Sequence, residues 1–464
     1  MPGLSGIVDV VVPAHNEEAS IGACLLSLIA QRDVSEINAV VVANGCSDRT
    51  AEVARGLEES LRAAGHRLSV IELPSAGKAR ALNAATPLLG GDIHVYLDAD
   101  VVLSARALAG LHAALARRSE ALLASPLQIP LLPAGRLARS YAEVWMELPS
   151  VAREVVGLGC YAVNPAGRAR WSEMPELVAD DAFVRARFSA DERLLLDRDF
   201  FLYLFPAGRD LLGVLARWRD GNRELTRLNA GDDPRAQLPG ALAAIARRPR
   251  LWRHLPAFAL LSAAVRLGAG RSPAWFRASR ALAPASVRGP RLWVGVLAGP
   301  SPVEDAFLAS LAGALAGVEY SLTVLGDSAL PAPGDPHTWD LALIVAPGHP
   351  IDPRELELLL MLARRLPAAG VYVAGTRAAG MKRSRVPAAI RDARSADGSL
   401  LLIGATAWGA LGAGQLGALR PRGRAALLRR ARRLGFRPLA LTLAVEPRSD
   451  EPGVRARPSM SSLS

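Results

Sequence analysis

Short apolar runs recur along the first part of the chain and alternate with longer amphipathic stretches. Four of them are rich in β-branched and aliphatic residues and predict strands buried on both faces, at Ile7–Pro13, Ile37–Val42, Leu68–Leu73 and His94–Leu97. The stretches between them predict helices, one beginning at Ser20 and one spanning Arg49–Ala64. Strands that alternate with helices favour right-handed βαβ units and a parallel sheet. The loops that follow these strands then meet at one edge of the sheet.

The alternation returns after a break near residues 286–290. Five further apolar runs predict strands, at Leu292–Leu297, Ser321–Leu325, Leu341–Val345, Val371–Val373 and Leu400–Ile403. We therefore expect an α/β protein in four parts. These are a domain with a parallel-rich mixed sheet at residues 1–233, a helical extension at 234–285, a Rossmann-like α/β domain at 286–447 and a disordered polar tail at 448–464.

Two aspartates, Asp98 and Asp100, follow the fourth strand directly. Ligands of open α/β sheets bind beyond the carboxyl ends of the strands, so this is the expected place for chemistry. Carboxylates one residue apart can offer hard oxygen ligands to a divalent cation, which can bridge a pyrophosphate. The spacing alone is weakly specific, because Asp197 and Asp199 repeat it after another apolar run.

Four motifs occur in this order: VVVPAHNEE, VVVANGCSDRT, GKARALNAA and VYLDADVVL. Together they resemble the nucleotide-sugar half of a family 2 glycosyltransferase of GT-A fold. The resemblance implies that Asp98 and Asp100 hold Mn²⁺ or Mg²⁺ against the diphosphate of a UDP or GDP sugar. It also implies a set of donor-binding residues around them: Pro13, Ala14, His15, Asn16, Glu17, Asn44, Asp48, Lys78, Asp98 and Arg217.

The acceptor half of such a domain is also recognisable. Residues 157–163 resemble its Gly-rich strand, and residues 177–185 resemble the Glu-Asp element that opens a helix, with Asp180 in the place of the Glu. The resemblance implies that Asp181 is the catalytic base and that transfer to an acceptor hydroxyl inverts the anomeric carbon, in glycan, glycolipid or polysaccharide biosynthesis. Asp180 should raise the proton affinity of Asp181, whereas the helix N-terminus should lower it. Processive relatives carry Gln-x-x-Arg-Trp where this chain has Val214 before Arg217, so polymerising activity is not implied.

Two other functions compete with this interpretation. A nucleotidyltransferase would need a Gly-rich basic loop after the first strand, and VPAHNEE is not one. A non-catalytic scaffold would not need Asp98, Asp100 and Asp181 together. The region from residue 286 resembles a degenerate class I methyltransferase, because the turn Leu297–Pro300 lacks the glycines that a nucleoside needs. It is therefore expected to serve packing or partner binding.

Charge and composition bear on partners and location. The chain of 464 residues has a formal net charge of +11, and few aromatic residues are interleaved with its basic residues. This excludes nucleic acid as the expected partner and fits an anionic membrane surface or phosphate-bearing substrates. Three cysteines form neither a metal pattern nor a disulfide framework, and no signal peptide is evident, so a cytoplasmic setting is expected.

The helical extension has two interpretations that the sequence leaves open. Its basic faces and bordering residues Trp252, Trp275 and Phe276 are typical of a segment that lies in a membrane interface. The same pattern fits a helical hairpin packed on the catalytic domain. The apolar run Leu255–Val265 is in any case too short to span a bilayer, which needs about 20 residues.

Overall fold

The computed structural model describes residues 4–131, 135–148, 151, 159–177, 179–206, 208–227, 243 and 245–269, the strands between Leu292 and Leu443, Val454–Arg455 and isolated residues from 356 to 434. The chain divides into two compact units. One comprises Met1–Leu282 with Ser449–Ser464, and the other comprises Ala283–Arg448. The division lies close to the boundary predicted at residue 286.

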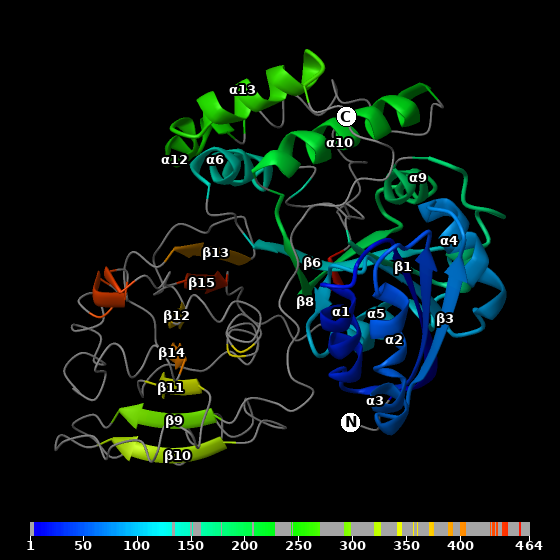
Figure 1. Cartoon of the computed structure of the whole chain (residues 1–464), viewed down its shortest axis with the longest axis horizontal. Coiled ribbons are helices and arrows are strands. Elements are labelled where there is room, and N and C mark those ends of the chain that lie inside the picture. Colours follow the sequence, from blue (N-terminus) through cyan, green and yellow to red (C-terminus); the bar gives the residue numbers. More distant parts are fainter. Residues whose placement is uncertain are drawn as a thin grey trace, which may run out of the picture. The chain divides into compact units, whose positions relative to one another are not determined.

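The four strands predicted first form the parallel part of the N-terminal sheet (Figure 1). They are β1 (Leu4–Ala14), β2 (Val34–Asn44), β3 (Arg67–Leu73) and β4 (Ile93–Leu97). β1 lies between β2 and β4, and β3 lies outside β2. All four strands run in one direction, so their carboxyl ends share one edge, as the sequence predicted.

An antiparallel part completes this sheet beyond β4. Its strands are β7 (Cys160–Val163), β6 (Leu123–Leu131), β8 (Arg193–Leu204), β5 (Val102–Leu103) and β16 (Val454–Arg455). β7 runs antiparallel to β4 and β6, β6 and β8 are parallel, and both β5 and β16 pair antiparallel with β8. The parallel-rich mixed sheet is therefore confirmed. β16 comes from the predicted disordered tail, whose other residues lie outside the described part of the chain.

Alternate residues of the strands bury themselves in two different layers. Val8, Val10 and Val12 of β1 pack with α1 (Ile21–Ile29), α2 (Thr50–Arg55), α3 (Glu58–Ala63) and α5 (Ala107–Leu115). On the other face, Val11 packs with α4 (Lys78–Ala85), and Phe183 of α9 (Asp180–Arg185) belongs to the same layer. This explains the nearly continuous apolar runs, since both faces of the strands are covered by helices.

Two local expectations were wrong in detail. The helix predicted at Arg49–Ala64 is divided into α2 and α3, because hydrogen bonding tightens at Leu57, whose amide donates to the Ala54 carbonyl. Helix α1 begins after Ser20 as predicted, but the Ser20 hydroxyl does not cap it. It donates instead to the Glu17 carboxylate.

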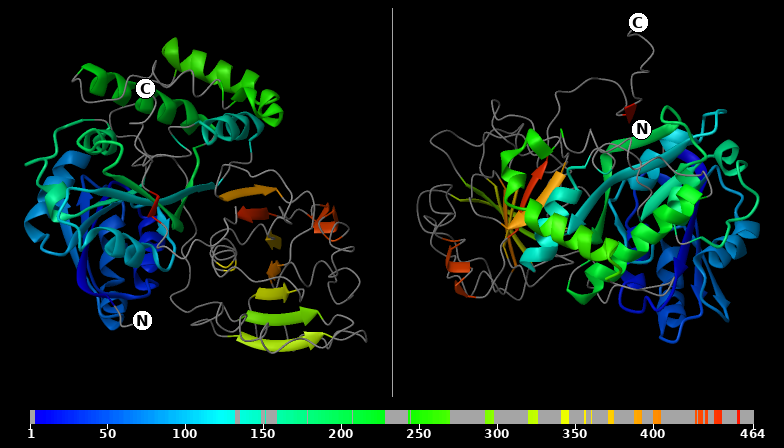
Figure 2. Two further views of the ribbon diagram at one scale, coloured as in Figure 1. Left: turned by 180° about the vertical axis from the view of Figure 1, so that it is seen from behind. Right: turned by 90° about the horizontal axis from the view of Figure 1, so that it is seen from above.

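A helical layer packs beside the sheet in the same unit. Its members are α6 (Arg136–Trp145), α10 (Arg209–Arg227), α12 (Pro249–Trp252) and α13 (Leu255–Arg266). Tyr141 and Trp145 of α6 share a buried cluster with Leu211 of α10 and Leu261 of α13. Figure 2 shows α10 and α13 as neighbouring green helices in both views. No helix in the described part of the chain has both the length and the apolar character needed to cross a bilayer.

The second unit contains a seven-stranded sheet of order β10-β9-β11-β14-β12-β15-β13 (Figure 1). The strands are β9 (Leu292–Leu297), β10 (Tyr320–Leu325), β11 (Leu341–Val345), β12 (Val371–Ala374), β13 (Ala388–Asp392), β14 (Leu400–Gly404) and β15 (Leu439–Leu443). The five predicted runs thus form strands, and β13 and β14 run against the rest. The glycine turn and the helices predicted here lie largely outside the described residues, so the methyltransferase resemblance stays a prediction.

Gly159 precedes β7 and fixes the strand against the loop that carries Asp98. Its φ is +85°, and a Cβ there would lie 2.9 Å from Val101 Cγ2 and 3.2 Å from a ring carbon of Phe201. Gly65 has a similar φ of +81° but open space around it. We expect Gly65→Ala to lower the free energy of unfolding by about 1 kcal/mol through strain alone, and Gly159→Ala by about 2–4 kcal/mol through strain and crowding. Urea denaturation measures both, and equal losses would contradict the crowding.

Candidate active site

Lys78, the first residue of α4, joins two groups of acids at the carboxyl edge of the sheet. Its Nζ lies 2.9 Å from Asp98 Oδ1 and 3.2 Å from Asp180 Oδ2. Burial alone would lower the pKa of Lys78, but the charges of Asp180, Asp98 and Asp181 outweigh burial and raise that pKa. One permanently charged ammonium therefore links the carboxylates predicted to face the donor with those predicted to face the acceptor.

Asp98 and Asp100 lie in the tight turn between β4 and β5. The Asp98 amide donates a 2.8 Å hydrogen bond to the Gly159 carbonyl, which holds the turn against β7. Both aspartate side chains remain partly exposed. Burial raises the pKa of Asp100 to about 6, the charge of Asp98 adds to this rise, and Lys78 and Arg217 oppose it. The turn thus presents two carboxylates that repel each other, and a bound cation would relieve that repulsion.

Asp180 and Asp181 occupy the first turn of α9 in different environments. Asp180 is only 4% exposed, and its ion pair with Lys78 compensates its charge. Asp181 is partly exposed, and its Oδ1 accepts a 2.8 Å hydrogen bond from the Ala182 amide. Burial and the charge of Asp180 raise the pKa of Asp181 to about 6 despite Lys78 and that amide. Burial and like charge therefore outweigh the Ala182 amide in the first turn of this six-residue helix and the Lys78 charge.

Asn44 holds the first loops together. Its buried side chain donates a hydrogen bond of 2.7 Å to the Ala14 carbonyl and accepts one of 3.0 Å from the Gly77 amide. The Asn44 backbone carbonyl lies 2.7 Å from Nδ1 of His15, which is partly exposed. Asn44 thus fixes the spacing between the end of β1 and the start of α4. Its predicted contact with the donor stays a prediction.

The loops after β1 and β2 are also joined through Asn16 and Asp48. Asn16 has a φ of +55°, which asparagine tolerates, and its Oδ1 accepts 2.7 Å from the Ser47 amide. The Asp48 carboxylate accepts hydrogen bonds from the amides of Glu18 (3.1 Å) and Thr50 (3.0 Å). Both predicted donor-binding side chains therefore shape the loops in which they lie.

The remaining residues predicted for the first loop lie beside these. Pro13 and Ala14 end β1 and are buried, and the Glu17 amide donates 2.7 Å to the Thr50 hydroxyl. The structure thus brings the predicted residues of three loops, Pro13 to Lys78, to one edge of the sheet.

Helix α10 contributes Arg217 from a distant part of the sequence. The Arg217 charge acts to lower the pKa of Asp100, so the two side chains are within electrostatic reach. Trp218 instead stacks on Trp145, with ring centroids 5.3 Å apart, and belongs to the helical layer. A Cβ added to Gly221 would lie 2.8 Å from the Ala179 Cβ, so α10 also approaches the residue before Asp180 closely.

Two tyrosines with buried hydroxyls near the acids, the buried Tyr161 and the half-buried Tyr203, were missed from the sequence. Among the described residues, neither the Tyr161 nor the Tyr203 hydroxyl has a hydrogen-bond partner. Burial raises the pKa of both, with Asp180 adding to the effect at Tyr161 and Asp100 at Tyr203. A signal for Tyr161 did exist, since strand alternation pairs it with Tyr96, on which it stacks at 4.9 Å.

The carboxylate oxygens of the turn that holds Asp98 and Asp100 suit a hard divalent cation as ligands. In the described residues no group of three or more His, Cys, Asp or Glu side chains forms a metal site by itself. Asp98 and Asp100 supply carboxylate oxygens only, and their mutual repulsion marks a place where positive charge is favourable. Magnesium and manganese sites of phosphoryl-binding proteins often use one or two carboxylates and complete their ligands with substrate oxygens.

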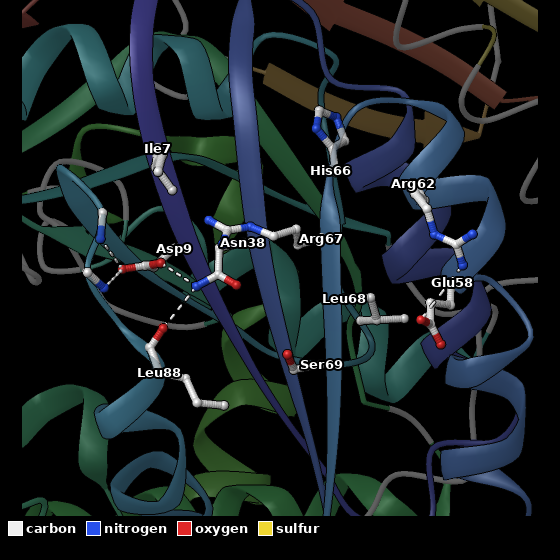
Figure 3. Close-up of a pocket in the computed structure, with 12 residues that line it drawn as sticks. Ile7, Asp9, Asn38, Glu58, Arg62, His66, Arg67, Leu68, Ser69 and Leu88 are labelled. Atoms are coloured by element: carbon white, nitrogen blue, oxygen red, sulfur yellow. Dashed lines mark hydrogen bonds and ion pairs between the residues drawn. The ribbon is translucent and has the colours of Figure 1, made fainter.

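A cavity of about 520 Å³ lies at the opposite edge of the sheet (Figure 3). Within it, the buried Asp9 carboxylate accepts hydrogen bonds from Asn38 (2.7 Å), Gly90 (2.8 Å) and Gly91 (2.7 Å). Arg62 forms an ion pair with Glu59 of α3 at 2.5 Å, and Arg67 forms one with Glu36 of β2, also at 2.5 Å. Asp9 therefore anchors the loop before β4, and both arginines of the cavity are paired with glutamates.

Comparison with known proteins identifies part of this unit. Residues 9–130 match the family model of Glycosyl transferase family 2. The predicted resemblance is thus confirmed for the region that contains the first loops, Lys78 and the Asp98–Asp100 turn. A comparison with curated protein sequences finds no match.

Solved structures of three proteins illustrate what the chain is similar to. Mannosyltransferase PcManGT from Pyrobaculum calidifontis, in complex with GDP-Man and Mn²⁺, is 20% identical with a TM-score of 0.40, covering 58% of this chain and 77% of that one. S. aureus TarS 1–349, in complex with UDP-GlcNAc, is 15% identical with a TM-score of 0.33, covering 55% and 79%. Glucosyl-3-phosphoglycerate synthase from Mycobacterium tuberculosis, in complex with Mn²⁺ and UDP-Glc, is 21% identical with a TM-score of 0.33, covering 50% and 81%.

The raised pKa of Asp181 predicts a stability effect with a definite sign. The pKa is about 6 in the folded protein and near 3.8 when unfolded, so the folded state loses stability as pH rises from about 4 to above 6. Asp181→Asn removes that loss, and it should raise the free energy of unfolding at pH 7 by on the order of 1–2 kcal/mol while changing little at pH 4. Denaturation at both pH values measures this. A variant less stable than the parent at pH 7 would contradict it.

Proposed function

We propose that this chain, with its family 2 glycosyltransferase region, transfers a sugar from a UDP or GDP sugar to an acceptor hydroxyl, with metal dependence and inversion of the anomeric carbon. The observation that carries the proposal is the double ion pair of Lys78. It places Asp98, from the predicted donor side, and Asp180, beside the predicted base, on one ammonium group. Donor and acceptor chemistry would then meet at one point of the sheet edge.

The donor would lie over the loops that follow β1 and β2. Asp98 and Asp100 would hold Mn²⁺ or Mg²⁺, which when bound neutralises charge growing on the leaving diphosphate. Lys78 and Arg217 supply further positive charge next to these acids. Their positions support a role in stabilising the diphosphate as it departs.

The acceptor would approach from the side of α9. Asp181 takes the hydroxyl proton on a carboxylate oxygen, and the acceptor oxygen forms the new bond to the anomeric carbon. The bond from that carbon to the diphosphate breaks, and the diphosphate leaves with the electron pair. Attack opposite the leaving group inverts the anomeric carbon. The Asp181 pKa of about 6 suits this step, because the group is mostly ionised near pH 7 and still accepts a proton readily.

Metal-dependent donor binding is the first test. In the parent, UDP or GDP with Mn²⁺ should raise the melting temperature, since a ligand that binds the folded state stabilises it. Asp100→Ala removes one of the two carboxylates of the turn and should abolish the Mn²⁺-dependent part of this shift. Differential scanning fluorimetry with nucleotide, with Mn²⁺ and with both measures it.

The second Asp-x-Asp pair provides the matched control. Asp197→Ala and Asp199→Ala change the same residue type at the same spacing on β8. Both variants should keep the parent's Mn²⁺-dependent shift. Loss of the shift in these variants and its retention in Asp100→Ala would refute the assignment of the metal-binding turn.

The role of Asp181 should be separable from donor binding. Asp181→Asn keeps the shape of the side chain and removes its basicity. Transfer to a hydroxyl acceptor should fall by about 10² or more, the usual contribution of a general base, while nucleotide and Mn²⁺ affinity stay within a few-fold. Until an acceptor is identified, slow hydrolysis of the sugar donor to free sugar is the measurement.

Asp180→Asn distinguishes the base from its neighbour. Because Asp180 is buried against Lys78, we expect it to tune the charge around Asp181 and not to receive the acceptor proton. Its replacement should cost less transfer activity than Asp181→Asn. With a true acceptor, parent-like transfer by Asp181→Asn, or a greater loss in Asp180→Asn, would reject Asp181 as the base.

A further inference from the structure

Helix α13 is apolar on two opposite sides. On its inner side Leu261 and Val265 are buried, and the Phe258 ring stacks on Tyr141 of α6 at 4.8 Å. On its outer side Leu260 is 62% exposed and Leu267, directly after the helix, is 89% exposed. A helix on the surface of a protein in water normally places polar residues on its outer side. A helix that is apolar on both sides usually has its outer side buried against another structure.

The rest of the outer side is apolar as far as Arg266, the last residue of the helix. Pro256, Ala259 and Ala263 are exposed at helical spacing with Leu260, so an apolar stripe runs along the helix. At the start of this stripe lies α12, whose Trp252 is 55% exposed. We call the exposed residues of α12 and α13, from Trp252 to Leu267, the outer surface.

The outer surface is fixed to the folded core. His254 Nδ1 lies 3.0 Å from the Ser140 hydroxyl of α6, and an Arg219 guanidinium nitrogen of α10 donates to the Val265 carbonyl. These two contacts tie α13 to α6 and α10. The apolar stripe is therefore held outward by the packing of the helical layer and is a stable feature of the fold.

Exposed arginines lie at and beside the outer surface. The described residues 245–269 contain five arginines and neither aspartate nor glutamate. Arg247, Arg253 and Arg266 are exposed at α12 and α13. Glu147, an acid that contacts this region, has a side chain only 2% exposed and is paired with Arg248. No described acid on the two helices thus offsets the exposed arginines.

We propose that the outer surface docks on an anionic lipid bilayer, with the apolar stripe at the level of the headgroups and the arginines on lipid phosphates. Apolar residues flanked by arginine and tryptophan are the composition of interfacial helices. The Trp252 indole donates a hydrogen bond of 3.3 Å from Nε1 to the Ile245 carbonyl. Its amphipathic ring is of the kind favoured at the level of the lipid headgroups. A second copy of the chain fits less well, because a symmetric interface would bring two arginine-rich surfaces together.

Vesicle flotation with the full chain tests this proposal. The parent should float with phosphatidylcholine vesicles that contain phosphatidylglycerol, should not float with phosphatidylcholine alone, and should be released by added salt. Leu260→Gln and Leu267→Gln should each weaken binding about 10-fold, because one leucine side chain fewer would then move from water into the bilayer. Arg253→Gln with Arg266→Gln should weaken binding to the anionic vesicles as well.

Leu88→Gln is the matched control. Leu88 is 46% exposed on the short helix η1 (Thr86–Leu88), away from α12 and α13 in the sequence, so its replacement should leave flotation unchanged. Melting temperatures of all variants show whether they fold. Three results would overturn the proposal: no binding of the parent to anionic vesicles, an equal loss in Leu88→Gln, or a dimer in solution that Leu260→Gln dissociates.

Discussion

The arrangement of the candidate active site depends on one ammonium group held between carboxylates from distant parts of the chain. Asp98 follows β4, Asp180 opens α9, and Lys78 begins α4, yet the three side chains form one cluster. Without the lysine, four neighbouring acids would face each other in a partly buried place, at a cost of several kcal/mol. The positive charge therefore makes it possible to fold two acid pairs from distant parts of the chain into the same edge of the sheet.

The sequence predicted the four parallel strands and their common edge, because strands buried on both faces produce apolar runs that are hard to mistake. It also predicted that Lys78, Asp98 and Asp100 lie at this edge, since the motifs that carry them lie in loops whose position follows from the order of the strands. The ion pairs of Lys78 were not predictable, because they depend on how α9 returns to α4 across about a hundred residues. Tyr161 and Tyr203 were missed for a related reason, since a buried phenol in a strand resembles any other core residue.

Several predicted donor-binding residues have a second role that only the structure reveals. Asn44, Asp48 and Asn16 use their side chains to join one loop to another. Polar groups that hold a loop by hydrogen bonds are expensive to replace, because each substitution leaves a partner unsatisfied. The polar character of these loops therefore serves a rigid frame, independently of any ligand.

Helix α10 lies against both the site and the outer helices. Arg217 is within reach of Asp100, Gly221 lies against Ala179, and Arg219 bonds to the end of α13. Packed helices keep axes about 8–10 Å apart, so α10 acts as a spacer of fixed thickness. On a bilayer bound by the outer surface, this spacer would set the height of the reacting carbon above the headgroups. An acceptor anchored in that bilayer would then be selected by its reach, in addition to its chemistry.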